Sequence, residues 1–260
     1  MESMNRRAHR GGQLLPFALA CVAAALAFSA PAARAATIVV PNGSAAVEGE
    51  GVSFLPFNAA GIGLPGFSVR YQQVYAAGQF GGLSGVISEI AFRAEGFGGV
   101  PFSTTGIDVE VRLSHTSAAP GALSSTFADN ITSPQTLVLD TSNLSLSSAG
   151  LPLVFDIVVN VDDLFAYDGV SNLLLDITVF NFPITTNLDA LDGGDATVVA
   201  LSATAESGTT AYSALVTQFT IVPAAVPVPE PGTLAVLGAA LAGLAFRPRR
   251  APKGTPQARP

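Results

Sequence analysis

One-by-one alternation of apolar and polar side chains is the pattern that most constrains the fold of this chain. In residues 107–113, IDVEVRL, a charged residue separates each apolar residue from the next. Because successive side chains of a β-strand point to opposite faces of the sheet, this pattern predicts a strand with one buried face. The same period recurs at residues 86–93 and 215–221. Between the two ends of the chain, we find no segment with the period of an amphipathic helix.

Two further segments, residues 153–159 and 173–180, are more uniformly apolar and predict central strands. Clusters of turn-forming residues stand between the predicted strands, among them Ala119-Pro120-Gly121 and Asp192-Gly193-Gly194-Asp195. About eight to ten short strands separated by such turns predict an all-β fold, an antiparallel β-sandwich of the jelly-roll type. No internal repeat is evident, which argues against a propeller or a solenoid.

The N-terminus has the three parts of a secretory signal peptide. Basic residues at positions 6–10 are followed by an apolar run at residues 14–28. Ala33 and Ala35 then supply the small side chains of a cleavage site, which predicts that residues 1–35 are removed. An uncleaved membrane anchor is the alternative, but the apolar run is short for a span.

The only cysteine, Cys21, lies within this predicted signal peptide. The mature chain would therefore contain no disulfide, and its stability after export would come from packing.

The C-terminal residues 227–250 combine a proline-containing motif, a short apolar run and a basic cluster. Pro229, Glu230 and Pro231 form the motif, and residues 232–246 carry no charge. As a helix, the apolar run would be about 22 Å long, shorter than the roughly 30 Å core of a bilayer, which predicts a transmembrane helix held only briefly. The basic cluster that would stop it consists of Arg247, Arg249 and Arg250. This cluster places the end of the chain on the cytoplasmic side.

This order of parts resembles the PEP-CTERM sorting signal of Gram-negative bacteria that produce exopolysaccharide. The resemblance implies recognition by an exosortase, a membrane-embedded enzyme of the cysteine transpeptidase type that cuts near the Pro-Glu-Pro motif. It also implies a transient stay in the inner membrane, followed by delivery to the cell surface or extracellular matrix. Residues 251–260 extend beyond the arginines, where such proteins usually end, and we expect a disordered tail there. An ordinary C-terminal tail anchor is the alternative.

Residues 36–226, the predicted β-sandwich domain, are strongly acidic. They contain 17 Asp and Glu against three basic residues, Arg70, Arg93 and Arg112, a net charge of −14. Such a charge repels DNA and anionic lipid, so we expect no nucleic-acid partner and membrane contact only through the C-terminal helix. Stretches at residues 69–75, 123–128 and 165–169, the last leading into 172–177, resemble a domain often found in PEP-CTERM proteins, which implies context and fold but no activity.

Candidate catalytic residues are few. His115 is the only histidine of the predicted mature chain, and we expect it to be a loop residue. Ser114 precedes it directly, and neighbours in a strand face opposite ways, so the two would form no dyad. With a single histidine and no cysteine, a zinc or copper site built from imidazole and thiolate ligands is excluded. We predict no enzymatic activity, although the many carboxylates leave two-acid glycoside hydrolysis chemically open.

Two groups of aspartates are candidates for a Ca²⁺ site. Asp189, Asp192 and Asp195 flank a Gly-Gly pair, and Asp162, Asp163 and Asp168 fall in a second predicted turn region. Oxygen ligands on a glycine-containing loop suit Ca²⁺, so the first group is our candidate metal site. Neither group has the EF-hand spacing, and solvated acidic turns are the alternative. We expect no other cofactor.

Together these features predict an exported, exosortase-processed protein of the cell surface or extracellular matrix. Its expected role is structural or adhesive, without catalysis, in the biofilm or exopolysaccharide layer. The alternatives are a lectin-like module that binds extracellular polysaccharide, assisted by Ca²⁺, and then a glycoside hydrolase. The expected partners are the exosortase and extracellular polysaccharide.

Overall fold

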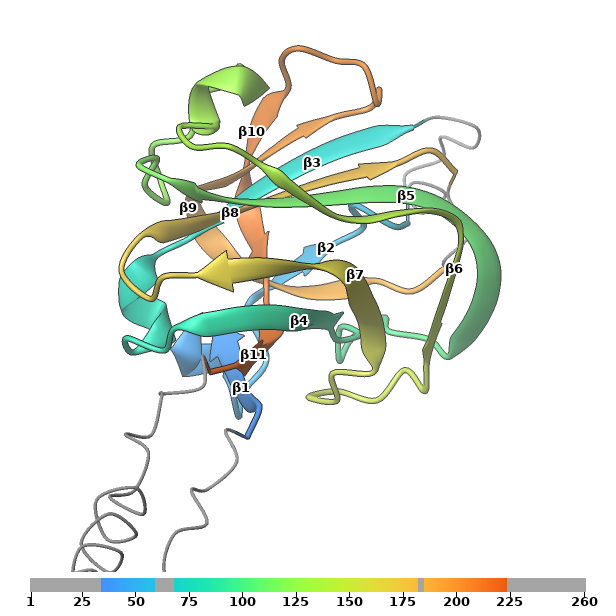
Figure 1. Cartoon of the computed structure of the whole chain (residues 1–260). Coiled ribbons are helices and arrows are strands. Elements are labelled where there is room, and N and C mark those ends of the chain that lie inside the picture. The colour runs from blue at the N-terminus through green and yellow to red at the C-terminus, as the bar shows by residue number, and fades with distance from the viewer. Residues whose placement is uncertain (1–33, 59–67, 182–184, 224–260) are drawn as a thin grey trace, which may run out of the picture. The chain divides into compact units, whose positions relative to one another are not determined.

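The computed structural model describes residues 34–58, 68–181 and 185–223 (Figure 1). The predicted signal helix with Ala33, the sorting signal 227–250, its transmembrane helix and the tail 251–260 lie outside these residues. Ala35 is exposed and directly precedes the first strand. Within the described part of the chain, no helix is long and apolar enough to cross a membrane.

The described residues form two antiparallel sheets. The first sheet has the order β1 (Ala36–Val40), β11 (Thr217–Val222), β4 (Gly85–Phe92), β7 (Ile157–Tyr167). The second has the order β10 (Thr209–Leu215), β9 (Leu188–Ala200), β3 (Val69–Tyr75), β8 (Asn172–Val179), β5 (Phe102–Thr116), β6 (Thr136–Ser148), and β2 (Gly51–Ser53) also pairs with β9. Within the described residues, three short 3₁₀ helices lie in the connections, η1 (Asn42–Ser44), η3 (Ala77–Phe80) and η4 (Phe127–Asn130). We call residues 36–222 the β-domain.

The two sheets share one apolar core. Ile90 and Phe219 of the first sheet belong to the same buried cluster as Val111 and Ile177 of the second. The rings of Tyr75 on β3 and Phe219 on β11 meet edge to face, with centroids 5.0 Å apart. Such edge-to-face contacts are a favoured arrangement of aromatic rings. The prediction of an all-β, antiparallel fold is therefore confirmed.

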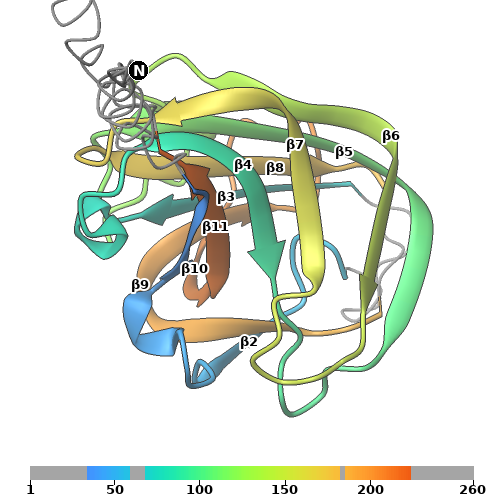
Figure 2. The same ribbon diagram turned by 60° about the horizontal axis from the view of Figure 1, so that its bottom comes forward.

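The two layers also approach each other along one side. Strand β6, at the edge of the second sheet, lies beside β7, at the edge of the first (Figure 2). The long strand β5 carries β6 toward this position by curving away from the plane of the second sheet (Figure 1). One side of the core is thereby covered by strands.

The alternating segment 107–113 is part of β5, as its pattern predicts. Val109, Val111 and Leu113 are fully buried, whereas the intervening charged residues are only partly buried. The apolar segment 173–180 corresponds to β8, which lies between β3 and β5 and is a central strand. In both strands the local pattern identified the element, and in β5 it also identified the face that packs on the core.

The prediction of a central strand at residues 153–159 is wrong. Strand β7 begins only at Ile157, and it forms an edge of the first sheet. Leu153 has a φ of 62° and is 41% exposed, so it belongs to the connection from β6. The Asp156 carboxylate accepts a hydrogen bond of 2.8 Å from the N–H of Ala149, which closes this connection just before β7 starts.

The alternating segment 215–221 contains the crossing from one sheet to the other. Leu215 ends β10 in the second sheet, and Thr217 begins β11 in the first. Val216 between them is fully buried, and its N–H donates to the carbonyl oxygen of Asp189 at 3.0 Å. One continuous alternating pattern therefore serves two strands in two different layers.

The turn predicted at residues 192–195 is also wrong, because these residues lie inside β9. The pairing of β9 with β10 shifts register here: Asp192 pairs with Ser213, whereas Thr197 pairs with Ala211. Extra residues on one strand opposite fewer on its partner form a β-bulge, and glycine favours such a position. The Asp-Gly-Gly-Asp sequence marks this irregularity rather than the end of a strand.

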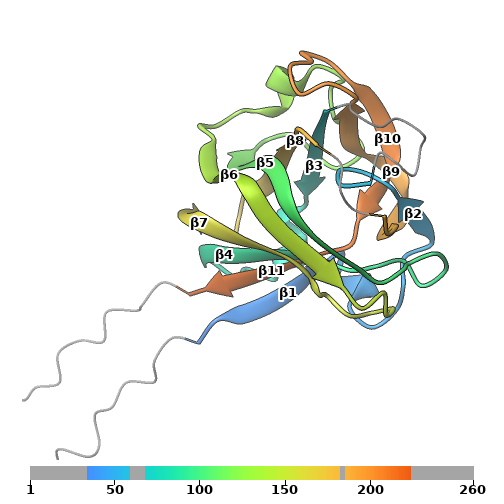
Figure 3. The ribbon, with the colours of Figure 1, turned by 90° about the vertical axis from the view of Figure 1, so that its right-hand side faces the viewer.

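The first and last strands of the β-domain bring its two ends together. Strands β1 and β11 are antiparallel, and Ala36 pairs with Ile221. The start of β1 and the end of β11 therefore lie on the same side of the β-domain (Figure 3). At the other end of these strands, Val40 pairs with Thr217, and Thr217 pairs with Phe92. The connection that follows β4 therefore lies on the side of the β-domain away from its two ends.

Candidate binding groove

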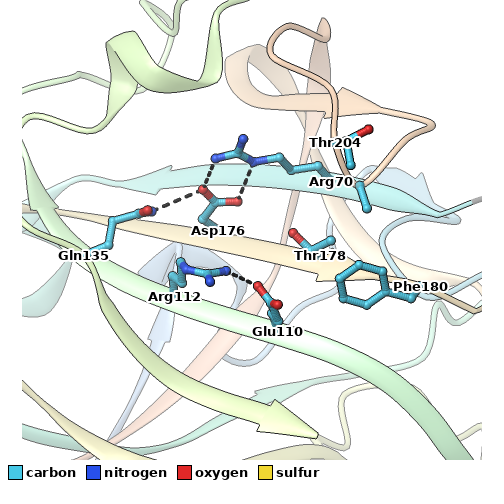
Figure 4. A pocket seen from close by; sticks show the side chains of 9 residues that line it. Arg70, Glu110, Arg112, Gln135, Asp176, Thr178, Phe180 and Thr204 are labelled. Atoms are coloured by element: carbon cyan, nitrogen blue, oxygen red, sulfur yellow. Dashed lines mark hydrogen bonds and ion pairs between the residues drawn. The ribbon is translucent and has the colours of Figure 1, made fainter. Parts of the chain in front are cut away.

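Polar side chains line up across the outer face of the second sheet. Strand pairing places residues of β3, β8 and β5 opposite one another in two rows: Arg70, Thr178 and Glu110; Gln72, Asp176 and Arg112. The residues that alternate with them face the core, as strand geometry requires. Figure 4 shows five of these six side chains, those of Arg70, Glu110, Arg112, Asp176 and Thr178, over the central strands.

Asp176 is the centre of this group. Its carboxylate accepts two hydrogen bonds from Arg70, from Nε to Oδ1 at 3.2 Å and from Nη2 to Oδ2 at 2.8 Å. Gln72 and Gln135 donate to Oδ2 at 2.9 and 3.2 Å. The Asp176 side chain is only 3% exposed. A paired arginine and carboxylate held by further amides form a rigid, planar polar surface.

A second ion pair lies beside the first. Arg112 donates through Nη1 to Oε2 of Glu110, and both side chains are partly exposed. The guanidinium of Arg70 also lies over the ring of Phe127, 4.6 Å from its centroid. This cation–π contact holds the arginine in place in addition to its bonds to Asp176.

Two adjoining pockets surround these residues, with volumes of about 320 and 330 Å³. Both pockets are lined by Arg70, Ala203 and Thr204, so we treat them as one feature and call it the Arg70 groove. One pocket extends over Arg112 and Glu110 to Phe180, and the other extends along residues 126–131. Residues 126–131 and the connection from β9 to β10 project from the same region of the sheet (Figure 1).

Backbone hydrogen bonds hold these two projecting segments against each other. The N–H of Phe127 donates to the carbonyl of Glu206 at 3.0 Å, and the N–H of Gly208 donates to that of Ser125 at 2.8 Å. The N–H of Ala203 donates to Oγ of Ser68 at 2.7 Å, which ties the same connection to the residue before β3. The walls of the groove are therefore fixed to the sheet that forms its floor.

The predicted metal site does not bring its aspartates together in the residues that the structure describes. Asp189 is buried and accepts hydrogen bonds from Nε of Arg93 at 2.5 Å and from the N–H of Gly49 at 2.9 Å. Asp192 is exposed and accepts a bond of 2.7 Å from Oγ of Ser213. Asp195 lies on β9, and its side chain is outside the description. Among the described side chains, no group of three or more His, Cys, Asp or Glu is placed to hold a metal ion.

The second group of aspartates is dispersed as well. Asp162 and Asp163 are exposed residues of β7 rather than of a turn. Asp168 follows β7 and accepts hydrogen bonds from the N–H groups of Val170 and Ser171, both at 2.9 Å, and from Oγ of Ser171 at 2.7 Å. Burial would raise the pKa of Asp168, but the bonds from Ser171 and Val170 outweigh it and lower the pKa to about 2. Asp168 therefore stabilises the turn between β7 and β8.

The expectation that His115 is a loop residue is wrong. It belongs to β5 and pairs with Leu173 on β8. Its Nε2 accepts a hydrogen bond of 3.2 Å from the N–H of Asp168, and its ring lies 5.0 Å from that of Phe165. Ser114 is fully buried beside it in the sequence, whereas His115 is partly exposed. The two side chains face apart, as strand geometry predicts.

The structure contains a buried ion pair, between Arg93 and Asp189, that the sequence did not predict. Arg93, which follows β4, is fully buried, and its Nη2 donates to the carbonyl of Val47 at 2.7 Å besides its bonds to Asp189. Burial and the nearby charges of Asp189 and Glu48 raise the pKa of Glu95 above its usual value, against the opposing effect of a bond from the N–H of Phe97. The only sequence sign of this cluster is a lone arginine at the end of a predicted strand.

Comparison with known proteins gives a match outside the β-domain. A two-sheet, all-β body with a polar groove is compatible with many functions, because fold alone does not define function. Residues 227–250 match the model of the PEP-CTERM protein-sorting motif. No curated protein matches the chain.

The chain therefore carries a PEP-CTERM sorting motif, as its resemblance implied, and this supports its assignment as an exosortase substrate. The motif indicates export, processing at the membrane and then delivery to the surface. Pro229, Glu230 and Pro231 lie within the matched residues, as do Arg247, Arg249 and Arg250. Their individual roles stay predictions.

Proposed function

We propose that this protein is a non-catalytic structural or adhesive component of the extracellular matrix or biofilm, which an exosortase releases from the inner membrane. The observation that carries the proposal is the sorting motif at residues 227–250. A signal of this kind brings a folded domain to the outside of the cell, where the polymers of the matrix are its surroundings. Extracellular polysaccharide is therefore its proposed partner beside the exosortase.

The strand order supports a rigid scaffold. Without β2, β9 and β10, the two sheets have the orders β1-β11-β4-β7 and β3-β8-β5-β6. We infer from this order an eight-stranded jelly roll, extended by three further strands at one edge of the second sheet. Jelly rolls are common among lectin and capsid domains, which present binding surfaces on a stable β-framework.

The groove supports binding rather than bond cleavage. Two of its three carboxylates, on Asp176 and Glu110, are engaged by guanidinium groups, which leaves only Glu206 where hydrolysis of a glycosidic bond needs a pair. General acid catalysis and nucleophilic attack on a glycosidic bond each need a carboxyl group that is available to the substrate. For this reason we propose no hydrolase activity.

The lectin-like alternative is favoured by one observation, the Arg70 groove itself. A form of this alternative that is assisted by Ca²⁺ would need ligands other than Asp189, since Arg93 and Gly49 already bind its carboxylate. If the Arg70 groove binds polysaccharide, that contact would account both for adhesion to the matrix and for lectin-like glycan binding.

The sorting step is tested by replacing Glu230, the acidic residue of the motif. In a host that produces an exosortase, we expect the Glu230→Gln variant to stay in the inner-membrane fraction, while the wild type reaches the surface or medium. Cell fractionation with immunoblotting measures the distribution. The exposed Glu50 of the β-domain provides the matched control, because Glu50→Gln removes the same charge outside both the motif and the groove. Normal release of Glu230→Gln would contradict the proposal.

A further inference from the structure

We propose that the Arg70 groove is a binding site for a neutral polysaccharide chain. The inference rests on the proposed function only for the presence of polysaccharide at the place of delivery. The site and the class of its ligand follow from the charge, hydrogen-bonding groups and apolar surface of the groove.

Charge selects a neutral ligand. The groove contains two of the three arginines found between residues 36 and 226, and each is paired with a carboxylate, so its floor is close to neutral. The rest of that region is strongly acidic, with no lysine. An anionic polymer would be repelled by this field and would find both guanidinium groups already occupied. A cationic polymer would find the carboxylates of the floor, on Asp176 and Glu110, occupied, with Glu206 on the wall as the one lining carboxylate outside these ion pairs.

The floor offers hydrogen bonds to hydroxyl groups. A guanidinium has five N–H groups, and Arg70 uses its Nε and Nη2 for the bonds to Asp176, so a residue that lines the groove retains further donors. Thr178 and Thr204 contribute hydroxyl groups that donate or accept. Sugar hydroxyls also donate and accept hydrogen bonds. They therefore match this combination of guanidinium donors and threonine hydroxyls better than a singly charged ligand group does.

The polar groups are held in place before a ligand arrives. Asp176 receives four hydrogen bonds from three side chains, and Phe127 lies against the guanidinium of Arg70. Little side-chain freedom would be lost on binding, which favours affinity. A weakly hydrated, fixed guanidinium is also better suited to binding hydroxyl groups than a mobile lysine.

Phe180 supplies an apolar surface next to the polar floor. It lines the groove at the end of β8 and is 40% exposed. The C–H face of a sugar ring is apolar, and an exposed aromatic ring buries it without loss of hydrogen bonds. The two pockets meet at Arg70, so consecutive units of one chain would lie on both sides of this residue.

The test is affinity electrophoresis of the full-length protein, purified in detergent, through native gels that contain a polysaccharide. The neutral probes are a glucan, a mannan and a galactan, and the acidic probe is polygalacturonate. We expect retardation by at least one neutral polysaccharide. Phe180→Ala and Arg112→Ala should each weaken this binding about tenfold, the size of effect expected for residues at the centre of a contact surface.

A third variant and a matched control keep the test independent of folding. Thr204→Trp places a large side chain where the two pockets adjoin and removes neither ion pair. This variant should abolish retardation. Phe97→Ala removes an aromatic ring that is 94% exposed and does not line the groove, and it should bind like the wild type. Circular dichroism identifies any variant that is unfolded.

Three results would overturn the inference. They are no retardation by any neutral probe, equal retardation of the wild type and the Thr204→Trp variant, and retardation by polygalacturonate alone that disappears with salt. None of them would affect the sorting claim, which depends on the localisation of Glu230→Gln. Failure of the groove and failure of the proposed sorting are therefore distinguishable.

Discussion

Arg93 and Asp189 form an ion pair whose side chains are both completely buried. Such a pair contributes little net stability, because desolvation offsets the attraction, but removal of one partner leaves an uncompensated charge in the interior. We expect Asp189→Asn to lower the free energy of unfolding by about 3–5 kcal/mol. Guanidinium-induced unfolding followed by circular dichroism measures this loss.

The control for this prediction lies in the same strand. Asp192 is exposed, and Asp192→Asn removes the same charge, so its effect should stay within about 0.5 kcal/mol. Equal effects of the two substitutions would mean that the buried arginine is stabilised by something other than Asp189.

Glu95 should make stability depend on pH. Because burial raises its pKa in the folded protein, the ionised form is disfavoured there relative to the unfolded chain. The cost is present at neutral pH and disappears as the pH falls through the raised pKa. Glu95→Gln should therefore unfold at a higher temperature than the wild type at pH 7, and the difference should vanish in acid.

Thermal unfolding at a series of pH values tests this sign. The exposed Glu50 is the control, since Glu50→Gln should leave the melting temperature close to that of the wild type throughout. A Glu95→Gln variant that is less stable at pH 7 would show that the surroundings favour the ionised carboxylate, which would contradict the raised pKa.

At the scale of elements, the bulge of β9 depends on glycine. Gly193 has a φ of 123°, a conformation that residues with a β-carbon rarely adopt, and a β-carbon there would meet no neighbour within 4 Å. Gly193→Ala would therefore cost backbone strain alone, which we expect to lower the free energy of unfolding by about 1–3 kcal/mol.

Gly43 is a matched control for this substitution. A β-carbon at Gly43 also meets nothing within 4 Å, and its φ is not in the positive region. Gly43→Ala should leave stability nearly unchanged in the same unfolding measurement. If both alanine variants were equally stable, the bulge would tolerate a side chain, and its glycine would have another explanation.

The strands of the groove show how much an element can reveal before its partners are known. The alternation in residues 107–113 identified the face of β5 that carries Glu110 and Arg112, and Asp176 interrupts an apolar strand. Period two is a local property, so these faces were predictable. The register that places Arg112 opposite Asp176 joins distant parts of the chain, and no local pattern determines it.

Irregular elements were the ones that prediction missed. The strand expected at residues 153–159 starts late, because Asp156 binds back to Ala149 and closes the preceding connection. The glycines at residues 193 and 194 indicated a turn, yet the residues before and after them pair with β10 on one side and with β2 or β3 on the other, so β9 runs through this segment. Tertiary pairing outweighed turn preference in this strand.

At the scale of the whole molecule, both ends of the β-domain lie on one side, and the connection after β4 lies on the opposite side. The pairing of β1 with β11 brings both ends to one side, while the connection after β4 lies at the far end of the same strands. The Arg70 groove lies on the outer face of the other sheet, away from the shared core. This arrangement leaves the groove accessible without requiring any change in the core.

The sequence by itself determined where this protein is sent and which kind of fold it has. A sorting motif is a short contiguous segment, so residues 227–250 reveal it without knowledge of the rest of the chain. Strand alternation is likewise local, and it was sufficient for an all-β, antiparallel body. The tertiary structure decided the groove and the buried ion pair. Arg70 meets Asp176 across 106 residues, and Arg93 meets Asp189 across 96. Such contacts depend on strand register and on sheet crossings, which only the packed chain as a whole establishes.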